Sequence, residues 1–188
     1  AGSGDLYRSM TFFNKWLPGG ESACCIPWNS NKRSLAINLK TPEAKEIIHK
    51  LVEKADIVVE NFRPGVMDKL GFGYTELKRI NPGIIYCSAT GWGPDGPYAS
   101  RPGQDLLVQG LSGAAMASGK KTDGPVAIGT ALSDQLGALH IVYSVLAALY
   151  YRTRTGKGQK IEVNLLQSVL AFEMQDFFTV QNLGRTFE

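Results

Sequence analysis

Short apolar runs alternate along this chain with segments whose apolar residues recur at helical spacing, and this alternation limits the possible folds most. The run Asp56–Glu60 has three β-branched residues in succession, a pattern typical of a parallel strand covered on both faces. Further strands are predicted at Ser34–Leu39, Ile84–Ala89 and Lys160–Leu165. Strands that alternate with helices imply right-handed crossovers, so the sequence predicts an α/β fold with a mostly parallel, doubly wound sheet.

Helices are predicted between these strands. Thr41 caps a helix that begins at Pro42 and carries an apolar stripe. Further helices are expected at Val66–Leu70, Thr75–Ile80 and Asp105–Met116, and from Asp134 to the Gly-rich turn after Thr155. Within the last of these, the apolar stretch of about 16 residues is shorter than the roughly 20 that a bilayer requires. We therefore expect a buried core helix and no membrane association.

Composition excludes several classes of protein. The chain has 188 residues, of which 44% are hydrophobic, so it can bury a core. Its net charge is only +3 and its basic residues are scattered, which argues against a nucleic-acid partner. The three cysteines, Cys24, Cys25 and Cys87, have neither metal-ligand spacing nor the even count of a disulfide framework. They are interpreted as small buried residues of a cytoplasmic protein, and no metal site is predicted.

The two ends of the chain do not resemble the ends of a complete α/β fold. Residues 1–31 are rich in Gly, Ser and Asn and lack either periodicity, so they are expected to form an extended arm or connection. The regular pattern occupies residues 32–188, and the sequence stops after its last predicted helix without a closing strand. We therefore expect a partial domain that is cut at both ends.

Polar residues follow the predicted strands at the sheet edge where ligands usually bind in open α/β folds. Asn61–Arg63 come directly after one strand, with Lys69 further on, and Lys40 follows another. This group could hold a phosphate-bearing ligand or form a solvated turn. Asp134 stands alone in an apolar region just before the long helix. It is either a helix N-cap or a nucleophilic or proton-transferring carboxylate.

Several motifs in this sequence resemble those of the class III CoA-transferases, the CaiB/BaiF family. They occur in the family's order between about residues 29 and 165: Asn29–Ser34, Lys40–Glu43, Ala55–Gly65, Asn81–Pro82, Gly93–Tyr98, Ser112–Gly113, Asp123–Pro125, Asp134 and Arg152–Gln159. The resemblance implies part of a Rossmann-like large domain, with the family's N-terminal strand and C-terminal small domain outside this sequence. It also implies an interlocked homodimer, acyl-CoA and a carboxylic acid as substrates, and no tightly bound cofactor.

The same resemblance implies roles for individual residues. Asp134 would be the catalytic aspartate, forming a mixed anhydride and then an aspartyl-CoA thioester. The CoA-binding residues would be Ile37, Asn38, Leu39, Lys40, Asn61, Phe62, Arg63, Lys69, Arg101, Gln104 and Asp105. The formyl-CoA branch commonly has Tyr and Glu where Gln104 and Asp105 stand, which argues against formyl or oxalyl specificity.

Two alternatives remain open. The α-methylacyl-CoA racemases resemble this chain over the same motifs and use a His and an Asp as acid and base. Gln104 occupies the position of that His, and Gln cannot take up a proton at neutral pH, so CoA transfer is favoured. A non-enzymatic segment that binds CoA or dimerises is the second alternative. His49 and His140 lie on predicted helices without a partner at ligand spacing and are interpreted as structural.

Overall fold

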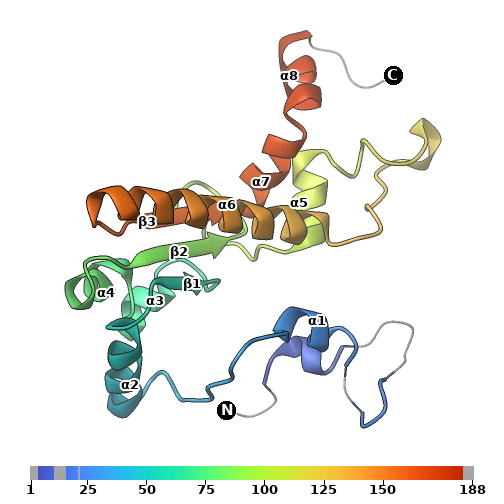
Figure 1. Ribbon diagram of the computed structural model, residues 1–188. Helices are drawn as coiled ribbons and strands as arrows, with labels where there is room; N and C mark the ends of the chain where they lie inside the picture. The colour runs from blue at the N-terminus through green and yellow to red at the C-terminus, as the bar shows by residue number, and fades with distance from the viewer. Residues whose placement is uncertain (1–3, 11–15, 21, 184–188) are drawn as a thin grey trace. The chain divides into compact units, whose positions relative to one another are not determined.

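The computed structural model describes residues 4–10, 16–20 and 22–183 (Figure 1). The contacts divide the chain into two units, residues 1–46 and 47–188, and the boundary lies inside helix α2, Pro42–Val52. The first unit contains the short 3-10 helix Leu6–Arg8 and helix α1, Cys25–Asn29. Cys24 and Cys25 are buried there, as predicted. The segment predicted as a strand at Ser34–Leu39 has no regular structure, because no described strand pairs with it.

Three parallel strands form the sheet of the second unit, in the order β1 (Ile57–Glu60), β2 (Ile85–Thr90) and β3 (Lys160–Asn164). Val59 is in register with Cys87, and Thr90 with Asn164. The predicted parallel α/β sheet is therefore confirmed over these strands. Since all three run the same way, their carboxyl ends meet at one edge of the sheet.

Helices cover both faces of this sheet. On one face, Val52 of α2 and Leu77 of α4 (Tyr74–Ile80) pack with Tyr86. On the other face, Val145 of α6 (Leu132–Thr155) packs with Cys87 and Val163. Successive residues of a strand point to opposite faces, so neighbouring Tyr86 and Cys87 belong to different cores. The remaining helices are α3 (Val66–Leu70), α5 (Asp105–Ser112), α7 (Leu165–Phe172), α8 (Met174–Leu183) and the 3-10 helix Lys121–Asp123.

Helix α5 is shorter than predicted. It ends at Ser112 rather than at Met116, because Gly113 adopts a left-handed φ of 99° and stops it. A third apolar core contains Val108 of α5, Ala114 just after that helix and Val169 of α7, and Leu132 and Leu136 of α6 pack against it.

Helix α6 differs from the predicted buried helix in length and in exposure. It has 24 residues, and an 18-residue window with a mean hydropathy of 1.3 has the length and composition of a membrane span. Only 22% of that window is buried, because one face packs on the sheet while Leu139, Val142, Leu146 and Tyr150 are exposed. The prediction of a wholly buried core helix is therefore wrong for this outer face.

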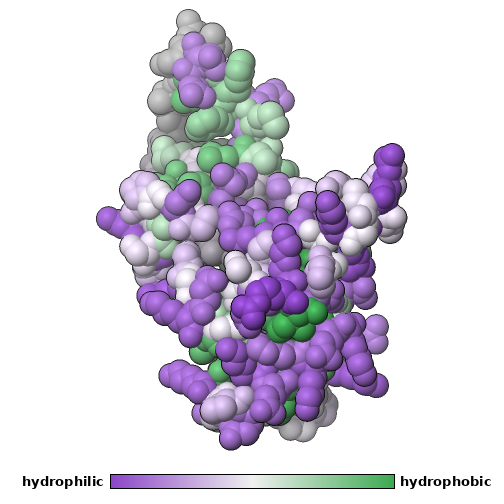
Figure 2. Space-filling view, turned by 90° about the vertical axis from the view of Figure 1, so that its left-hand side faces the viewer, coloured by the Kyte–Doolittle hydropathy of each residue, from purple (hydrophilic) through white to green (hydrophobic). Residues whose placement is uncertain are grey.

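Apolar side chains are also exposed on α8. Figure 2 shows hydrophobic colour at the upper end of the view, where Figure 1 places α8, and hydrophilic colour over much of the remaining face. Met174, Phe177 and Phe178 are exposed on this helix. Helix α8 thus carries apolar side chains that no described part of the chain covers.

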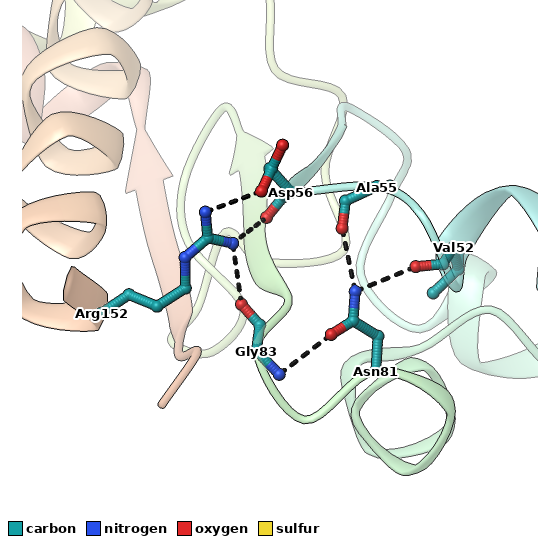
Figure 3. A network of polar contacts seen from close by, with 6 residues as sticks. All are labelled: Val52, Ala55, Asp56, Asn81, Gly83 and Arg152. Carbon is teal, nitrogen blue, oxygen red and sulfur yellow. Dashed lines mark hydrogen bonds and ion pairs between the residues drawn. The ribbon is translucent and has the colours of Figure 1, made fainter. Parts of the chain in front are cut away.

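Two side chains join the amino-terminal ends of β1 and β2 to the helices (Figure 3). Asn81 donates to the carbonyls of Val52 and Ala55, at 3.0 and 2.9 Å, and accepts from the amide of Gly83. Arg152, near the end of α6, donates to the carbonyl of Gly83 and pairs with the carboxylate of Asp56 at 2.7 Å. These bonds hold the helices on both faces to the same end of the sheet.

We expect Asn81→Ala to lower the free energy of unfolding by about 1–3 kcal/mol, because it removes three hydrogen bonds from partly buried backbone groups. Urea denaturation of the full-length protein measures this change. Arg79→Ala is the matched control, since it removes an exposed ion pair with Glu76, worth less than about 1 kcal/mol. Equal losses of unfolding free energy in the two variants would contradict the stabilising role of the Asn81 hydrogen bonds.

Candidate functional site

A pocket of about 170 Å³ lies at the carboxyl ends of β1 and β2. It is lined by the loops that follow the two strands and by the loop that leads into α5: Asn61, Phe62, Arg63, Pro64, Thr90, Gly91, Trp92, Ala99, Arg101, Pro102 and Gly103. This lining includes two arginines and no carboxylate. Guanidinium groups suit phosphate and carboxylate ligands, so the pocket can hold an anion.

Hydrogen bonds fix the loops around this pocket. The Asn61 side chain donates to the carbonyl of Ala89 at 2.7 Å, which ties the end of β1 to β2. The indole of Trp92 donates to the carbonyl of Pro102 at 3.0 Å. Tyr98 lies between Trp92, with ring centroids 5.5 Å apart, and the guanidinium of Arg101, which is 4.7 Å from the Tyr98 ring. The arginine is therefore held by an aromatic surface rather than by a carboxylate.

Two glycines allow the pocket loops to cross closely. A Cβ atom added to Gly91 would lie 2.4 Å from the Cα of Gly103. A Cβ atom added to Gly103 would lie equally close to the Cα of Gly91. Real Cβ atoms do not approach backbone this closely, so any side chain at either position would push the loops apart.

A second pocket, of about 240 Å³, lies beside the first and shares Arg63, Pro64 and Thr90 with it. Its lining includes the carboxylates of Glu60, Asp68 and Glu162, and the amine of Lys160 pairs with Glu162. Three acidic residues against two basic ones make this pocket less suited to a polyphosphate. The pocket at the strand ends is thus the stronger candidate for an anion.

Asp134 lies in the first turn of α6, as its third residue. The expectation that it caps the helix is wrong, because Ala131 holds the N-cap position and the helix begins two residues earlier than predicted. Within the described part of the chain, the Asp134 carboxylate accepts no hydrogen bond, and the residue is exposed. Partial burial of the carboxyl group, and secondly the negative charge of Asp105, raise the pKa of Asp134.

Asp105 is bound to the start of α6. One oxygen of its carboxylate accepts from the amide of Ser133 at 2.7 Å, and the other from the side chain of Gln109 at 2.7 Å. Ser133 is fully buried and directly precedes Asp134. Asp105 thus supplies, from another helix, the acceptor that an N-cap residue normally provides.

The predicted residues of the loop before α5 separate into two groups. Arg101 lines the pocket, whereas Gln104 and Asp105 do not. Gln104 is exposed at the N-cap of α5 and makes no capping hydrogen bond with its side chain. Two residues span at most about 7 Å, so Asp105 is close to Gly103 of the pocket. The pocket and the start of α6 are therefore neighbours.

The remaining predicted CoA-binding residues are placed differently. Asn61, Phe62 and Arg63 line the pocket, and Phe62 is exposed. Lys69 is exposed on α3 and does not line it. The first unit contains the other four predicted residues, Ile37–Lys40, which lead into α2. In the turn before this helix, the Asn38 side chain accepts a hydrogen bond from the Lys40 amide. The predicted capping of α2 by Thr41 is confirmed by its bond to the Ala44 amide.

The two histidines have structural contacts. Nδ1 of His140 lies 2.8 Å from the carbonyl of Leu136 in its own helix, and its ring contacts Tyr143. His49 packs edge-on against Phe72. Among residues 4–10, 16–20 and 22–183, no group of three or more His, Cys, Asp or Glu side chains is placed so that it could hold a metal ion.

Sequence reasoning missed Trp92, Tyr98 and Gln109. Trp92 and Tyr98 lie in a Gly- and Pro-rich loop with no periodicity that would place them. Gln109 had one signal, since it is an amide within the apolar run of α5, and the structure buries it completely.

The model of CoA-transferase family III matches residues 1–187. The chain belongs to this family. The acetyl-CoA:oxalate CoA-transferase of Acetobacter aceti is 46% identical over 77% of this chain and 37% of its own length. The human succinyl-CoA:glutarate CoA-transferase is 38% identical over 90% of this chain and 38% of its own length. A CaiB/BaiF family protein from Brucella suis has a structure that matches with a TM-score of 0.80 and 39% identity, over 84% of this chain and 42% of that protein.

These comparisons confirm the CaiB/BaiF resemblance and the α/β fold class. The chain spans about two fifths of the length of the curated relatives that it matches. Most of its length, including both units, is covered by the match.

We expect Gly91→Ala to lower the free energy of unfolding by about 1–3 kcal/mol, because its methyl group meets the backbone of Gly103. Gly110→Ala is the matched control, since nothing lies within 4 Å of a Cβ at this exposed position in α5. Helix propensity then predicts a gain of about 0.5–1 kcal/mol for the control. Thermal denaturation measures both, and a neutral Gly91→Ala would contradict the close crossing.

Proposed function

We propose that this chain forms part of an acyl-CoA:carboxylate CoA-transferase in which Asp134 is the catalytic nucleophile. The observation that carries the proposal is the exposed carboxylate of Asp134 in the first turn of α6, which accepts no hydrogen bond from the residues that the structure describes. It lies close to a pocket whose lining has two arginines and no acid. Membership of the family supports CoA transfer. Relatives whose names pair an acyl-CoA with oxalate or glutarate support a carboxylate as the acceptor.

The first half-reaction transfers CoA to the enzyme. An oxygen of Asp134 attacks the thioester carbonyl of the donor, the carbon–sulfur bond breaks, and CoA leaves as a thiolate. The product is a mixed anhydride between Asp134 and the acyl group. The thiolate then attacks the aspartyl carbonyl, which releases the donor's carboxylate and leaves an aspartyl-CoA thioester. Each step exchanges one activated acyl group for another, so no external energy source is needed.

The second half-reaction repeats these steps in reverse order with the acceptor. The acceptor carboxylate attacks the aspartyl thioester, CoA thiolate leaves, and a new anhydride forms. The thiolate attacks the acceptor's carbonyl in that anhydride and frees the Asp134 carboxylate. Partial burial and the charge of Asp105, which raise the pKa of Asp134, also make its ionised form a stronger nucleophile.

The pocket provides groups for the CoA phosphates. Arg63 and Arg101 supply positive charge, and Phe62 offers an exposed apolar surface. Asn61 lines the pocket with a side-chain amide that is held by its bond to the carbonyl of Ala89. Ile37–Lys40, Lys69, Gln104 and Asp105 stay predicted contacts of CoA. We further propose a cytoplasmic enzyme with no tightly bound cofactor, an interlocked homodimer as its assembly, and neither nucleic acid nor a membrane as a partner.

We expect Asp134→Ala to abolish CoA transfer in the full-length protein while binding of CoA persists, because the variant removes the nucleophile but leaves the pocket. Transfer is measured by chromatography of acyl-CoA products after incubation with acetyl-CoA or succinyl-CoA and oxalate or glutarate. Binding is measured by calorimetry with CoA. Retained transfer in Asp134→Ala would overturn the proposal.

The same samples distinguish the racemase alternative. A 2-methylacyl-CoA with deuterium at the α-carbon would lose that deuterium without any acceptor if Asp134 moved a proton instead. CoA transfer without such exchange supports the transferase. Exchange without transfer would replace it, and CoA binding with neither activity would leave the non-enzymatic alternative.

We expect Arg101→Ala to weaken CoA binding by roughly 10- to 100-fold, because a charge-assisted hydrogen bond to phosphate is worth about 1.5–3 kcal/mol. Arg154→Ala is the control of equal charge. Arg154 stacks on Tyr150 near the end of α6 and is not part of the lining of the pocket that contains Arg101. If both variants weaken CoA binding equally, only the total charge of the protein matters and the pocket is not the phosphate site.

A further inference from the structure

Gln109 is completely buried between α5 and the segment that leads into α6. Its amide nitrogen donates to the Asp105 carboxylate at 2.7 Å and to the carbonyl of Thr130 at 3.2 Å. Its amide oxygen accepts from the backbone nitrogen of Ile128 at 2.9 Å. Both donors of the amide are used, so the side chain has one orientation that satisfies all of its partners.

These bonds lead directly to Asp134. Ile128 and Thr130 belong to the irregular segment before α6, and Asp105 binds the amide of Ser133 on its other carboxylate oxygen. The Ser133 hydroxyl donates back to the carbonyl of Asp105 at 3.2 Å. One buried amide therefore fixes both the path of the segment and the carboxylate that holds the first turn of the helix.

A buried polar network of this kind costs free energy unless every member is bonded, and apolar side chains of similar volume would fill the space more cheaply. The surrounding core is apolar, with Val108, Leu132 and Val169 packed together. The network has a geometric use, because a hydrogen-bonded amide defines position within a few tenths of an ångström whereas an apolar contact permits sliding.

We propose that Gln109 is a positioning residue that sets the reactive geometry of Asp134 through Asp105 and Ser133. This inference rests on the proposed function of Asp134. Gln109 touches neither substrate nor the reacting carboxylate. Small displacements of a nucleophile lower the rate of the chemical step more than they lower substrate binding. The role therefore appears in kcat and not in KM or in CoA affinity.

The test compares Gln109→Met with Val108→Ala in the full-length protein. The methionine keeps the volume of Gln109 and removes its hydrogen bonds, whereas Val108→Ala leaves a small cavity at a fully buried neighbour without touching the network. We expect Gln109→Met to lower kcat at least 10-fold per CoA-binding site, with KM for acyl-CoA changed less than 2-fold. We expect Val108→Ala to retain kcat within 2-fold. Equal kcat losses in the two variants, or a normal kcat in Gln109→Met, would overturn the inference.

A second pair of variants tests the bond itself. Gln109→Glu places a carboxylate against Asp105, and adding Asp105→Asn restores a donor and acceptor between the two positions. We expect the double variant to recover at least 5-fold of the kcat lost in Gln109→Glu. No recovery would contradict the Gln109–Asp105 bond as the connection, and this pair decides the matter if Gln109→Met does not fold.

Failure of the inference is distinguishable from failure of the proposed function. If Asp134→Ala is inactive and Gln109→Met has a normal kcat, only the positioning role is wrong. If Asp134→Ala retains CoA transfer, the proposed function itself is wrong.

Discussion

The parallel pairing of β1, β2 and β3 is the constraint on which the rest of the second unit depends. The central strand β2 is buried through Ile85, Tyr86 and Cys87, and its two faces contribute to two different apolar cores. A slip of one residue in its register would exchange these faces and expose both cores. The register therefore fixes which helices lie on each side of the sheet. It also brings the loops after Glu60 and Thr90 together at one edge, where the pocket forms.

Polar groups at the two ends of the sheet have different tasks. At the amino-terminal end, Asn81 and Arg152 satisfy backbone carbonyls and one carboxylate, which joins helices to strands. At the carboxyl end, Arg63 and Arg101 face a pocket that contains no acid. The bonds that join helices to strands and the proposed anion pocket thus lie at opposite ends of the strands, and ligands of open α/β sheets generally bind outside the carboxyl ends.

The sequence predicted those parts of the fold that depend on local patterns. The strands at residues 57–60 and 85–90 begin with apolar runs, whereas polar and apolar residues alternate in the strand at residues 160–164. The stop of α3 at Gly71 follows from a left-handed glycine. The run at Ser34–Leu39 also looks like a strand in sequence, but no strand among the described residues pairs with it, so local pattern alone gave the wrong result there. Strand formation needs a neighbour, and a single sequence does not reveal one.

The candidate site was predictable only in part for the same reason. Asn61, Phe62, Arg63 and Arg101 follow strand ends or match family motifs, and the structure brings them to one pocket. The capping of α6 by Asp105 crosses 28 residues of sequence, and no local spacing indicates such a pair. An N-cap was one of the two roles considered for Asp134, because a carboxylate is favoured beside the free N–H groups at a helix start, whereas the capping acceptor comes from another helix.

Each of the two units contains buried cysteine thiols whose reactivity depends on how often that unit opens. Cys87 is fully buried in β2, and burial, with the charge of Glu60, raises its pKa to about 11. At neutral pH only about one thiol in 10⁴ is then ionised, so an alkylating reagent reaches it essentially when the sheet opens. Cys24 and Cys25 are buried in the first unit instead. The rates at which the three thiols are labelled therefore measure how often each unit opens, independently of any enzymatic assay.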